Sequence, residues 1–342
     1  MKICVIFGGA ASDNIKSFYV KDGISYDFYK NEPYVHNHAV SSNLHVTGWN
    51  FPFLWEGGCF LNLEQWVKND LDLPAYDFDI ILYSNERLGL DDDKYQYYCV
   101  DRLRNKYPNA LIVGYLKEVE LSIHNREVRS KNRVNFLQSC DKIIAHGVST
   151  MKELTKYREL ESSIDRKLDY VSHPVNIDLY YDTFYSTEKE ESIFAYLPNP
   201  VHRRAETYNF AKYISEKYNI PIKFKPLEPN QKFDYLPLKQ FIELWSPSSF
   251  HFNLDPSPTH PGQQAIQVAN VGSINIGGMN ESHHILYPET ATCDKMILEE
   301  KFVEYLRDLN KRFQVVEYAW NKLNENYGYT VVKNQLTSLY KG

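Results

Sequence analysis

The chain of 342 residues has few cysteines and no Cys-x-x-Cys pair. Its five cysteines stand far apart, at positions 4, 59, 99, 140 and 293. Disulfide-stapled small domains and structural zinc sites need closer spacing, so the pattern argues against both. We expect free, buried thiols, a cytoplasmic setting (the host cytoplasm if the protein is viral) and no divalent metal.

The sequence also lacks long apolar runs and a positive net charge. No run approaches the roughly 18 residues that cross a membrane, and the apolar stretch after Met1 is too short for a signal peptide. Lys and Arg number 38 against 44 Asp and Glu, which gives a net charge of −6. This charge argues against a dominant surface for non-specific phosphate binding, although it leaves room for a local basic groove.

What the sequence does contain is an alternation of short apolar runs and longer helical stretches, which predicts an α/β protein. The alternation predicts doubly wound parallel sheets, with ligands at the carboxyl ends of the strands. Pro174 interrupts it, so we predict Rossmann-like domains at 1–172 and 188–315, a linker at 173–187 and a helical tail at 316–342. Strands are predicted at 2–7, 78–83, 110–115, 142–145, 192–197, 221–224, 250–254 and 273–276. Helices are predicted at 93–107, 125–139, 204–218, 263–270 and 299–323.

The stretch 260–278, HPGQQAIQVANVGSINIGG, is the most informative. Gly262 precedes a short helix, Gln267 lies one turn into that helix, and Gly272 follows its end. Amides at Gly262 and Gln263 suit a pyrophosphate, and Gln267 suits ribose hydroxyls. The spacing resembles the donor-site signature of GT-B glycosyltransferases, two-domain enzymes that use a nucleotide sugar. That family usually has Glu where Gln267 stands, and Gln keeps the hydrogen bond without the charge. An ordinary helix–Gly–strand unit is the competing interpretation.

Arg203 and Arg204 follow the strand predicted at 192–197. In the family that the spacing resembles, the loop at this place commonly supplies cations to the donor phosphates. A guanidinium can bind phosphate oxygens bidentately and neutralise a leaving diphosphate without a metal. Cations at a helix start oppose the helix dipole, which favours a nearby anion over the alternative of a solvated pair.

The same resemblance extends to other parts of the chain. It implies that the C-terminal tail crosses back onto the first domain. Gly9 follows the first strand and suits a close approach to donor or acceptor. His283, shortly after Gly277 and Gly278, is expected to face the sugar.

An acceptor-side carboxylate is predicted at Glu118, just past the strand at 110–115. A carboxylate there could take the proton of the acceptor hydroxyl, and the local order resembles the catalytic Asp region of phage DNA β-glucosyltransferases. Glu120 competes for this role, and two solvated carboxylates are the other interpretation. A basic cluster lies around and beyond Glu118, and it would line the acceptor mouth if the acceptor were DNA; a solvated helix face is the alternative. Its members are Lys117, Arg126, Arg129, Lys131 and Arg133.

Together with the resemblance, these residues predict an enzyme that transfers a hexose from a UDP-sugar to an acceptor hydroxyl. Two acceptors stay open: hydroxymethylated pyrimidine in phage DNA and a cell-envelope glycan. Nucleotide-sugar epimerases and binding modules share the fold and stay open as alternatives. The stereochemistry and the oligomeric state are also open.

Overall fold

The computed structural model describes residues 1–8, 16–33, 48–62, 76–85, 100–115, 136–145, 167–177, 184–196, 204–225, 238–256 and 262–342. These residues form two compact units. Unit 1 holds the described residues up to Pro174 together with Tyr329–Gly342, and unit 2 holds Val175–Gly328. Among the described residues the chain passes between the units after Pro174 and again after Gly328. The first of these points lies within the predicted linker at 173–187, and the second lies within the predicted tail at 316–342, twelve residues after its start.

Unit 1 is built on a sheet whose described strands have the order β3-β2-β4-β1-β5-β6-β7-β8. The six strands from β4 to β8 in this order are parallel, whereas β2 pairs antiparallel with β3 and β4. The strands are β1 (Ile3–Gly8), β2 (Phe18–Lys21), β3 (Ile24–Asp27), β4 (Cys59–Asn62), β5 (Ile80–Asn85), β6 (Leu111–Tyr115), β7 (Lys142–Ala145) and β8 (Leu168–Tyr170). The described helices of unit 1 are the 3-10 helix η2 (Gly48–Leu54), α3 (Val100–Lys106) and α15 (Tyr329–Lys341).

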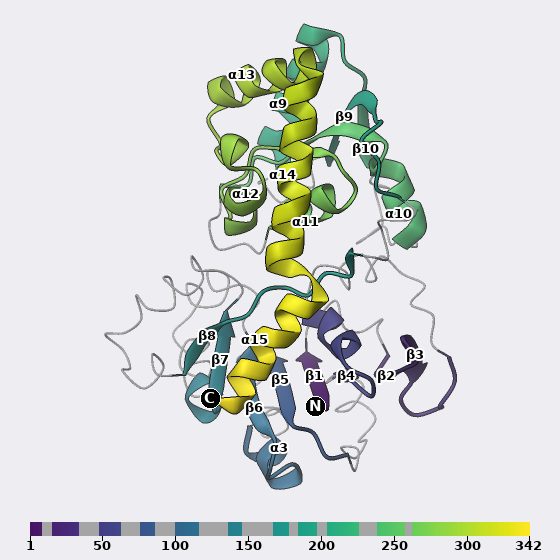
Figure 1. Ribbon diagram of the computed structural model, residues 1–342, viewed down its shortest axis with the longest axis vertical. Coiled ribbons are helices and arrows are strands. Elements are labelled where there is room, and N and C mark those ends of the chain that lie inside the picture. The colour runs from purple at the N-terminus through teal and green to yellow at the C-terminus, as the bar shows by residue number, and fades with distance from the viewer. Residues whose placement is uncertain are drawn as a thin grey trace. The chain divides into compact units, whose positions relative to one another are not determined.

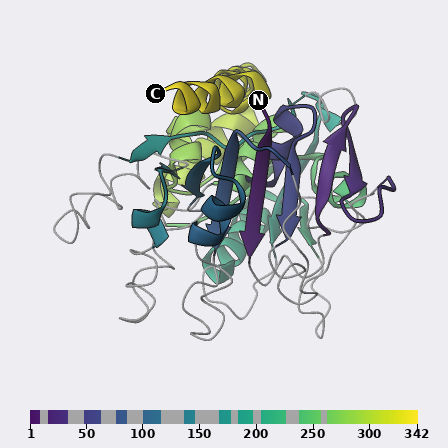
Figure 2. The same ribbon diagram turned by 90° about the horizontal axis from the view of Figure 1, so that it is seen from below.

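Burial on both faces explains why the central strands of unit 1 are apolar throughout. Cys4 and Ile6 pack in the core cluster that includes Leu103 of α3. The last helix, α15, lies across a face of the sheet (Figures 1 and 2) and buries Val332 and Leu336. A parallel strand covered on both faces reads as a continuous apolar run rather than an alternating one, which is why these strands were predictable.

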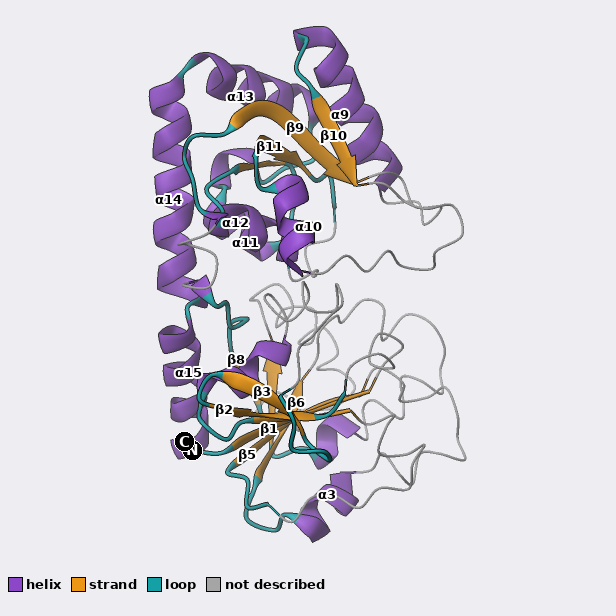
Figure 3. Ribbon diagram, turned by 90° about the vertical axis from the view of Figure 1, so that its right-hand side faces the viewer, coloured by secondary structure: helices purple, strands orange, loops and turns teal. Residues whose placement is uncertain are grey.

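Unit 2 contains a second, fully parallel sheet with the strand order β10-β9-β11-β12. Helices flank its strands on both sides (Figure 3), so the predicted α/β class with parallel sheets is confirmed. The strands are β9 (Glu190–Tyr196), β10 (Ile222–Lys225), β11 (Ser248–Phe252) and β12 (Ile274–Ile276). The helices are α9 (Arg204–Tyr218), α10 (Leu238–Trp245), α11 (Gln263–Asn270), α12 (Glu281–Leu286), the 3-10 helix η5 (Pro288–Thr290), α13 (Lys295–Arg307) and α14 (Leu309–Tyr327).

The two faces of this sheet differ in chemistry. One face packs against α9 and α13, where Phe250 and Phe252 meet Phe302 at ring-centroid distances of 4.8 and 5.7 Å. On the other face, His251 lies between Phe194 and Trp245 of α10.

The helix predicted at 299–323 is in fact two helices, because Asp308 separates them and its side chain accepts a hydrogen bond from the amide of Lys311 at 3.0 Å.

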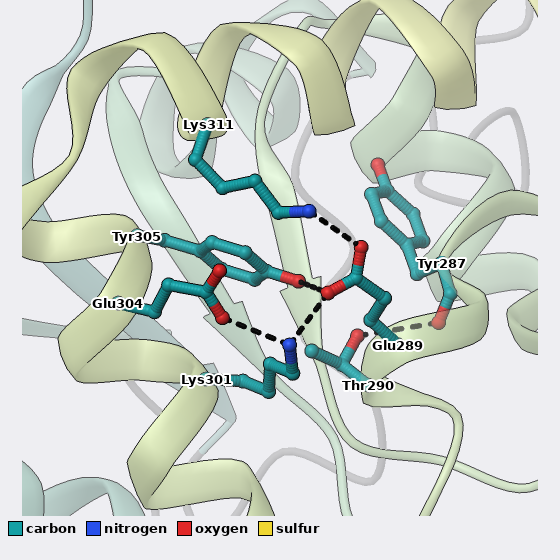
Figure 4. A network of polar contacts seen from close by, with 7 residues as sticks. All are labelled: Tyr287, Glu289, Thr290, Lys301, Glu304, Tyr305 and Lys311. Carbon is teal, nitrogen blue, oxygen red and sulfur yellow. Dashed lines mark hydrogen bonds and ion pairs between the residues drawn. The ribbon is translucent and has the colours of Figure 1, made fainter.

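A charged network joins η5, α13 and α14 (Figure 4). Glu289 accepts hydrogen bonds from Lys301 at 2.6 Å and from Lys311 at 2.9 Å. The hydroxyl of Tyr305 donates to the same carboxylate at 3.4 Å. The bond from Lys301, and then that from Lys311, lowers the pKa of Glu289 below its ordinary 4.5. A single half-exposed carboxylate therefore holds both long C-terminal helices of unit 2 to η5.

We predict that Glu289→Gln lowers the free energy of unfolding by about 1 kcal/mol at neutral pH, because screening by solvent limits a partly exposed pair. The loss should shrink as the pH falls below 4.5, since a carboxylate with a lowered pKa contributes only while it is ionised. Urea unfolding at pH 7 and at pH 4 measures both effects. Glu325→Gln, which removes the exposed pair with Lys322 on α14, is the control and should change stability by less than about 0.5 kcal/mol. Equal losses in the two variants would contradict the role of Glu289.

Candidate functional site

Three helices of unit 2 begin beyond the carboxyl ends of its parallel strands. Helix α9 follows β9, α11 follows β11 and α12 follows β12. Parallel strands end at one edge of a sheet, so the N-terminal ends of these helices gather there, with partial positive charge and free amides. We call this the carboxyl edge of unit 2. It is the place where open α/β sheets bind ligands.

Hydrogen bonds between the connecting segments brace this edge. The amide of Leu254 donates to the Thr207 hydroxyl in the first turn of α9 at 2.9 Å. The side-chain amide of Gln264 donates to the Phe252 carbonyl at 3.2 Å, which ties the start of α11 to the end of β11. The amide of Met279 donates to the Asp255 carbonyl at 3.0 Å. The segments after β11 and β12 therefore keep fixed positions relative to the helix starts.

Gly262 precedes the first turn of α11 in a left-handed conformation, with φ of 68°. A side chain at this position would collide with its neighbours: a Cβ would lie 2.7 Å from the Cγ of Asn280 and 2.7 Å from the Cβ of Ser282. Glycine is therefore required twice, for the backbone conformation and for the space. Gly262, at the N-cap position of α11, has no side chain with which to cap the helix.

Asn280 and His283 form a buried pair beside this glycine. The side-chain oxygen of Asn280 accepts the amide of His283 at 3.1 Å and lies 2.6 Å from its Nδ1. Because that oxygen is an acceptor, Nδ1 of His283 carries the proton and Nε2 carries the lone pair. The ring is fully buried, and Nε2 finds no hydrogen-bond partner within the described part of the chain.

Burial lowers the pKa of His283 to about 3, against an opposing effect of Asp255 and with a small contribution from His284. The imidazole is therefore neutral at physiological pH. Its ring lies against Gly278, where a Cβ would meet Nε2 at 2.6 Å. The φ of Gly278 is 103°, a conformation that side chains rarely adopt. His283 thus fills the space that a side chain at position 278 would need.

Comparison with known proteins gives matches in structure alone. No protein-family model matches the chain, and no curated protein matches its sequence. An alpha-glucosyltransferase solved with UDP and a 13-mer DNA containing a HMU base superposes with a TM-score of 0.64 and 12% identity, covering 100% of this chain and 99% of the other. Anabaena Alr3699/HepE in complex with UDP covers 100% of both chains, with a TM-score of 0.59 and 10% identity. TarM of S. aureus has a TM-score of 0.51 and 9% identity, and the match covers 94% of this chain and 62% of TarM.

The chain has the GT-B fold. In that fold the edge described above belongs to the second of two Rossmann-like domains. Among the described residues, no group of three His, Cys, Asp or Glu side chains is arranged to hold a metal ion. None of the described helices combines the length and the apolarity that crossing a membrane requires.

The structure places several of the predicted donor residues at the carboxyl edge. Arg204 is the first residue of α9 and Gln263 the first of α11, and Gly262 immediately precedes α11. Gln267 is half-buried in the second turn of α11. Contrary to the expectation that His283 faces a sugar, its ring is buried under Gly278, while its neighbour His284 is exposed. The other predicted site residues lie outside the described residues: Gly9, Lys117, Glu118, Arg126, Arg129, Lys131, Arg133 and Arg203.

The sequence analysis missed Thr207, Asn280 and Ser282. Asn280 had a readable signal, because Asn directly before a short helical segment with Glu at its first position is typical of a helix start. Its second role, the contact with Gly262, is a tertiary contact between residues 18 positions apart, and no local pattern indicates it.

We predict that Gly262→Ala destabilises the protein by about 3 kcal/mol or more, because backbone strain and overpacking add. Gly23→Ala is a matched control, since Gly23 has a similar φ of 72° but no atom lies within 4 Å of the place that its Cβ would take. It should cost only the backbone strain, about 1–2 kcal/mol. Thermal unfolding of the two variants measures the difference. If both variants lose the same stability, the contact with Asn280 and Ser282 is not a constraint.

Proposed function

We propose that the protein transfers a hexose from a UDP-sugar to an acceptor hydroxyl. The supporting observation is the carboxyl edge of unit 2, where the helix starts at Arg204 and at Gly262 come together in a GT-B chain. A pyrophosphate is the ligand that suits helix N-termini beside an arginine. Solved structures with the same fold contain UDP, among them the alpha-glucosyltransferase and HepE.

In this proposal the acceptor oxygen attacks the anomeric carbon, and the bond between that carbon and the diphosphate oxygen breaks. Arg203 and Arg204 neutralise the charge that develops on the departing UDP. The first amides of α11, from Gln263 on, bind the pyrophosphate, and Gln267 binds ribose hydroxyls. Glu118 takes the proton of the acceptor hydroxyl. The residues of unit 2 thus supply the charge stabilisation, so the transfer needs no cofactor and no divalent metal.

Hydroxymethylated pyrimidine in phage DNA is the acceptor that we propose first. The similar alpha-glucosyltransferase was solved with DNA containing a HMU base, and the cluster around Lys117, Arg129 and Arg133 offers cations to DNA phosphates. A glycan acceptor is the second candidate, supported by HepE solved with UDP and glucose and by TarM with alpha-GlcNAc-glycerol. The free, buried thiols of Cys4, Cys59 and Cys140 support a cytoplasmic setting for either.

An epimerase or a binding module with this fold would behave differently. An epimerase converts the nucleotide sugar without any acceptor, and a binding module shows no turnover. Incubation with UDP-hexoses, with and without acceptor, separates the three alternatives.

We expect Arg204→Ala to weaken UDP binding by about 1.5–3 kcal/mol, since it removes charge-assisted bonds to the diphosphate. Gln267→Ala should cost about 1 kcal/mol, as a neutral hydrogen bond does. Isothermal titration calorimetry measures both. Arg307→Ala, at the exposed C-terminal end of α13, is the control and should leave the affinity unchanged. Wild-type affinity in Arg203→Ala and in Arg204→Ala would remove the arginines from the site.

The DNA acceptor predicts a steep fall of transfer with salt, because cations of the protein displace counterions from DNA. Labelled-sugar transfer to hydroxymethylated duplex DNA, measured at low and moderate salt, checks this. Replacing Arg129 and Arg133 by Gln should reduce the salt dependence. If sugar is transferred to a glycan acceptor, and no donor tested gives transfer to DNA, the glycan is the acceptor.

A further inference from the structure

Two glycines of the carboxyl edge are held by one pair of side chains. The side-chain amide of Asn280 occupies the space beside Gly262, before α11, and the ring of His283 occupies the space beside Gly278, after β12. The Asn280 side-chain oxygen and His283 Nδ1 are 2.6 Å apart. Asn280 and His283 both belong to the segment after β12, and their hydrogen bond lies within it. The contact between this segment and the one before α11 is the packing of Asn280 against Gly262.

We propose that Asn280 and His283 are positioning residues of the donor site, which hold Gly262 and Gly278 in the backbone conformations that binding requires. The inference rests on the proposed function, and it assigns a role to residues that need not touch the donor. This geometry requires a neutral imidazole with its proton on Nδ1. Only that form donates a hydrogen bond to the Asn280 side-chain oxygen and keeps the Nε2 atom beside Gly278 uncharged. A protonated ring would place a cation in a fully buried position.

The unpartnered Nε2 strengthens the inference. A buried acceptor without a partner destabilises the fold, and a phenylalanine at the same place would avoid that cost. His283 therefore offers no packing advantage over an apolar ring. What it offers is the Nδ1 proton, and the only contact of that proton among the described atoms is with the Asn280 side chain.

Three substitutions separate positioning from packing. His283→Phe keeps a ring against Gly278 but removes the donor to Asn280. His283→Asn keeps a side-chain NH group near the place of Nδ1 and removes the rest of the ring. His251→Phe is the matched control, because His251 is also fully buried in unit 2, and its pKa is likewise lowered to about 3 by burial, but it packs between Phe194 and Trp245.

Two measurements on the full chain test the inference: UDP affinity by calorimetry, and hydrogen exchange of the amides in the first turn of α11 and in Gly277–Asn280. We expect His283→Phe to raise the dissociation constant of UDP about tenfold and to speed exchange in both segments. His283→Asn should restore the affinity to within about threefold of wild type. His251→Phe should leave the affinity and the exchange at these segments unchanged, whatever it does to the melting temperature.

An unchanged affinity and unchanged exchange in His283→Phe would overturn the inference, as would a His283→Asn variant as impaired as His283→Phe. These outcomes differ from failure of the proposed function, in which the wild-type protein binds no UDP. In that case the exchange of the two segments still decides, since it needs no ligand: faster exchange confined to His283→Phe supports the positioning role, and equal exchange in all variants refutes it.

Discussion

The side-chain oxygen of Asn280 is the contact on which the carboxyl edge of unit 2 depends. It caps α12, accepts the imidazole proton of His283 and lies against the α-carbon side of Gly262. A short amide meets all three demands, because it accepts two hydrogen bonds and remains small enough to lie beside a glycine. The left-handed start of α11 follows from this packing as much as from the freedom of Gly262. If the segments after β11 and β12 bind a diphosphate, their spacing is set here.

The strands and helices predicted from the sequence are those whose burial leaves a local pattern. Runs such as Ile3–Gly8 and Lys142–Ala145 are apolar at nearly every position because helices cover both faces of a parallel strand. The hairpin of β2 and β3 was missed, although Asp22 and Gly23 both have positive φ and form the turn that an Asp-Gly pair favours. The short strand β8 was not predicted, because three half-buried residues carry no period.

The residues of the candidate site also fall into two groups: those that a local sequence pattern indicates, and those that depend on tertiary contacts. Gly262 and Gln267 could be found because their spacing lies within one helix and its preceding loop. Asn280 could not be placed against Gly262, since that contact depends on how β12 returns beside α11. His283 was expected to face a sugar, but a helix of six residues that buries Ser282, His283 and Leu286 turns position 284 outward instead. The periodicity of α12 was too short to decide this from sequence alone.

Helix α12 also connects the carboxyl edge with the points at which the chain leaves unit 2. The hydroxyl of Tyr327, the last residue of α14, donates to the Ser282 hydroxyl at 3.1 Å, and Ser282 packs against Gly262. The backbone carbonyl of the same Tyr327 accepts the amide of Val175 at 2.9 Å, and Val175 pairs with Gly328. The segments of unit 2 at Val175 and at Tyr327–Gly328 are thus hydrogen-bonded to one another and lie two contacts away from the start of α11. Tyr327 and Ser282 are both buried, so the end of α14 and the start of α11 are held in close packing through these two side chains.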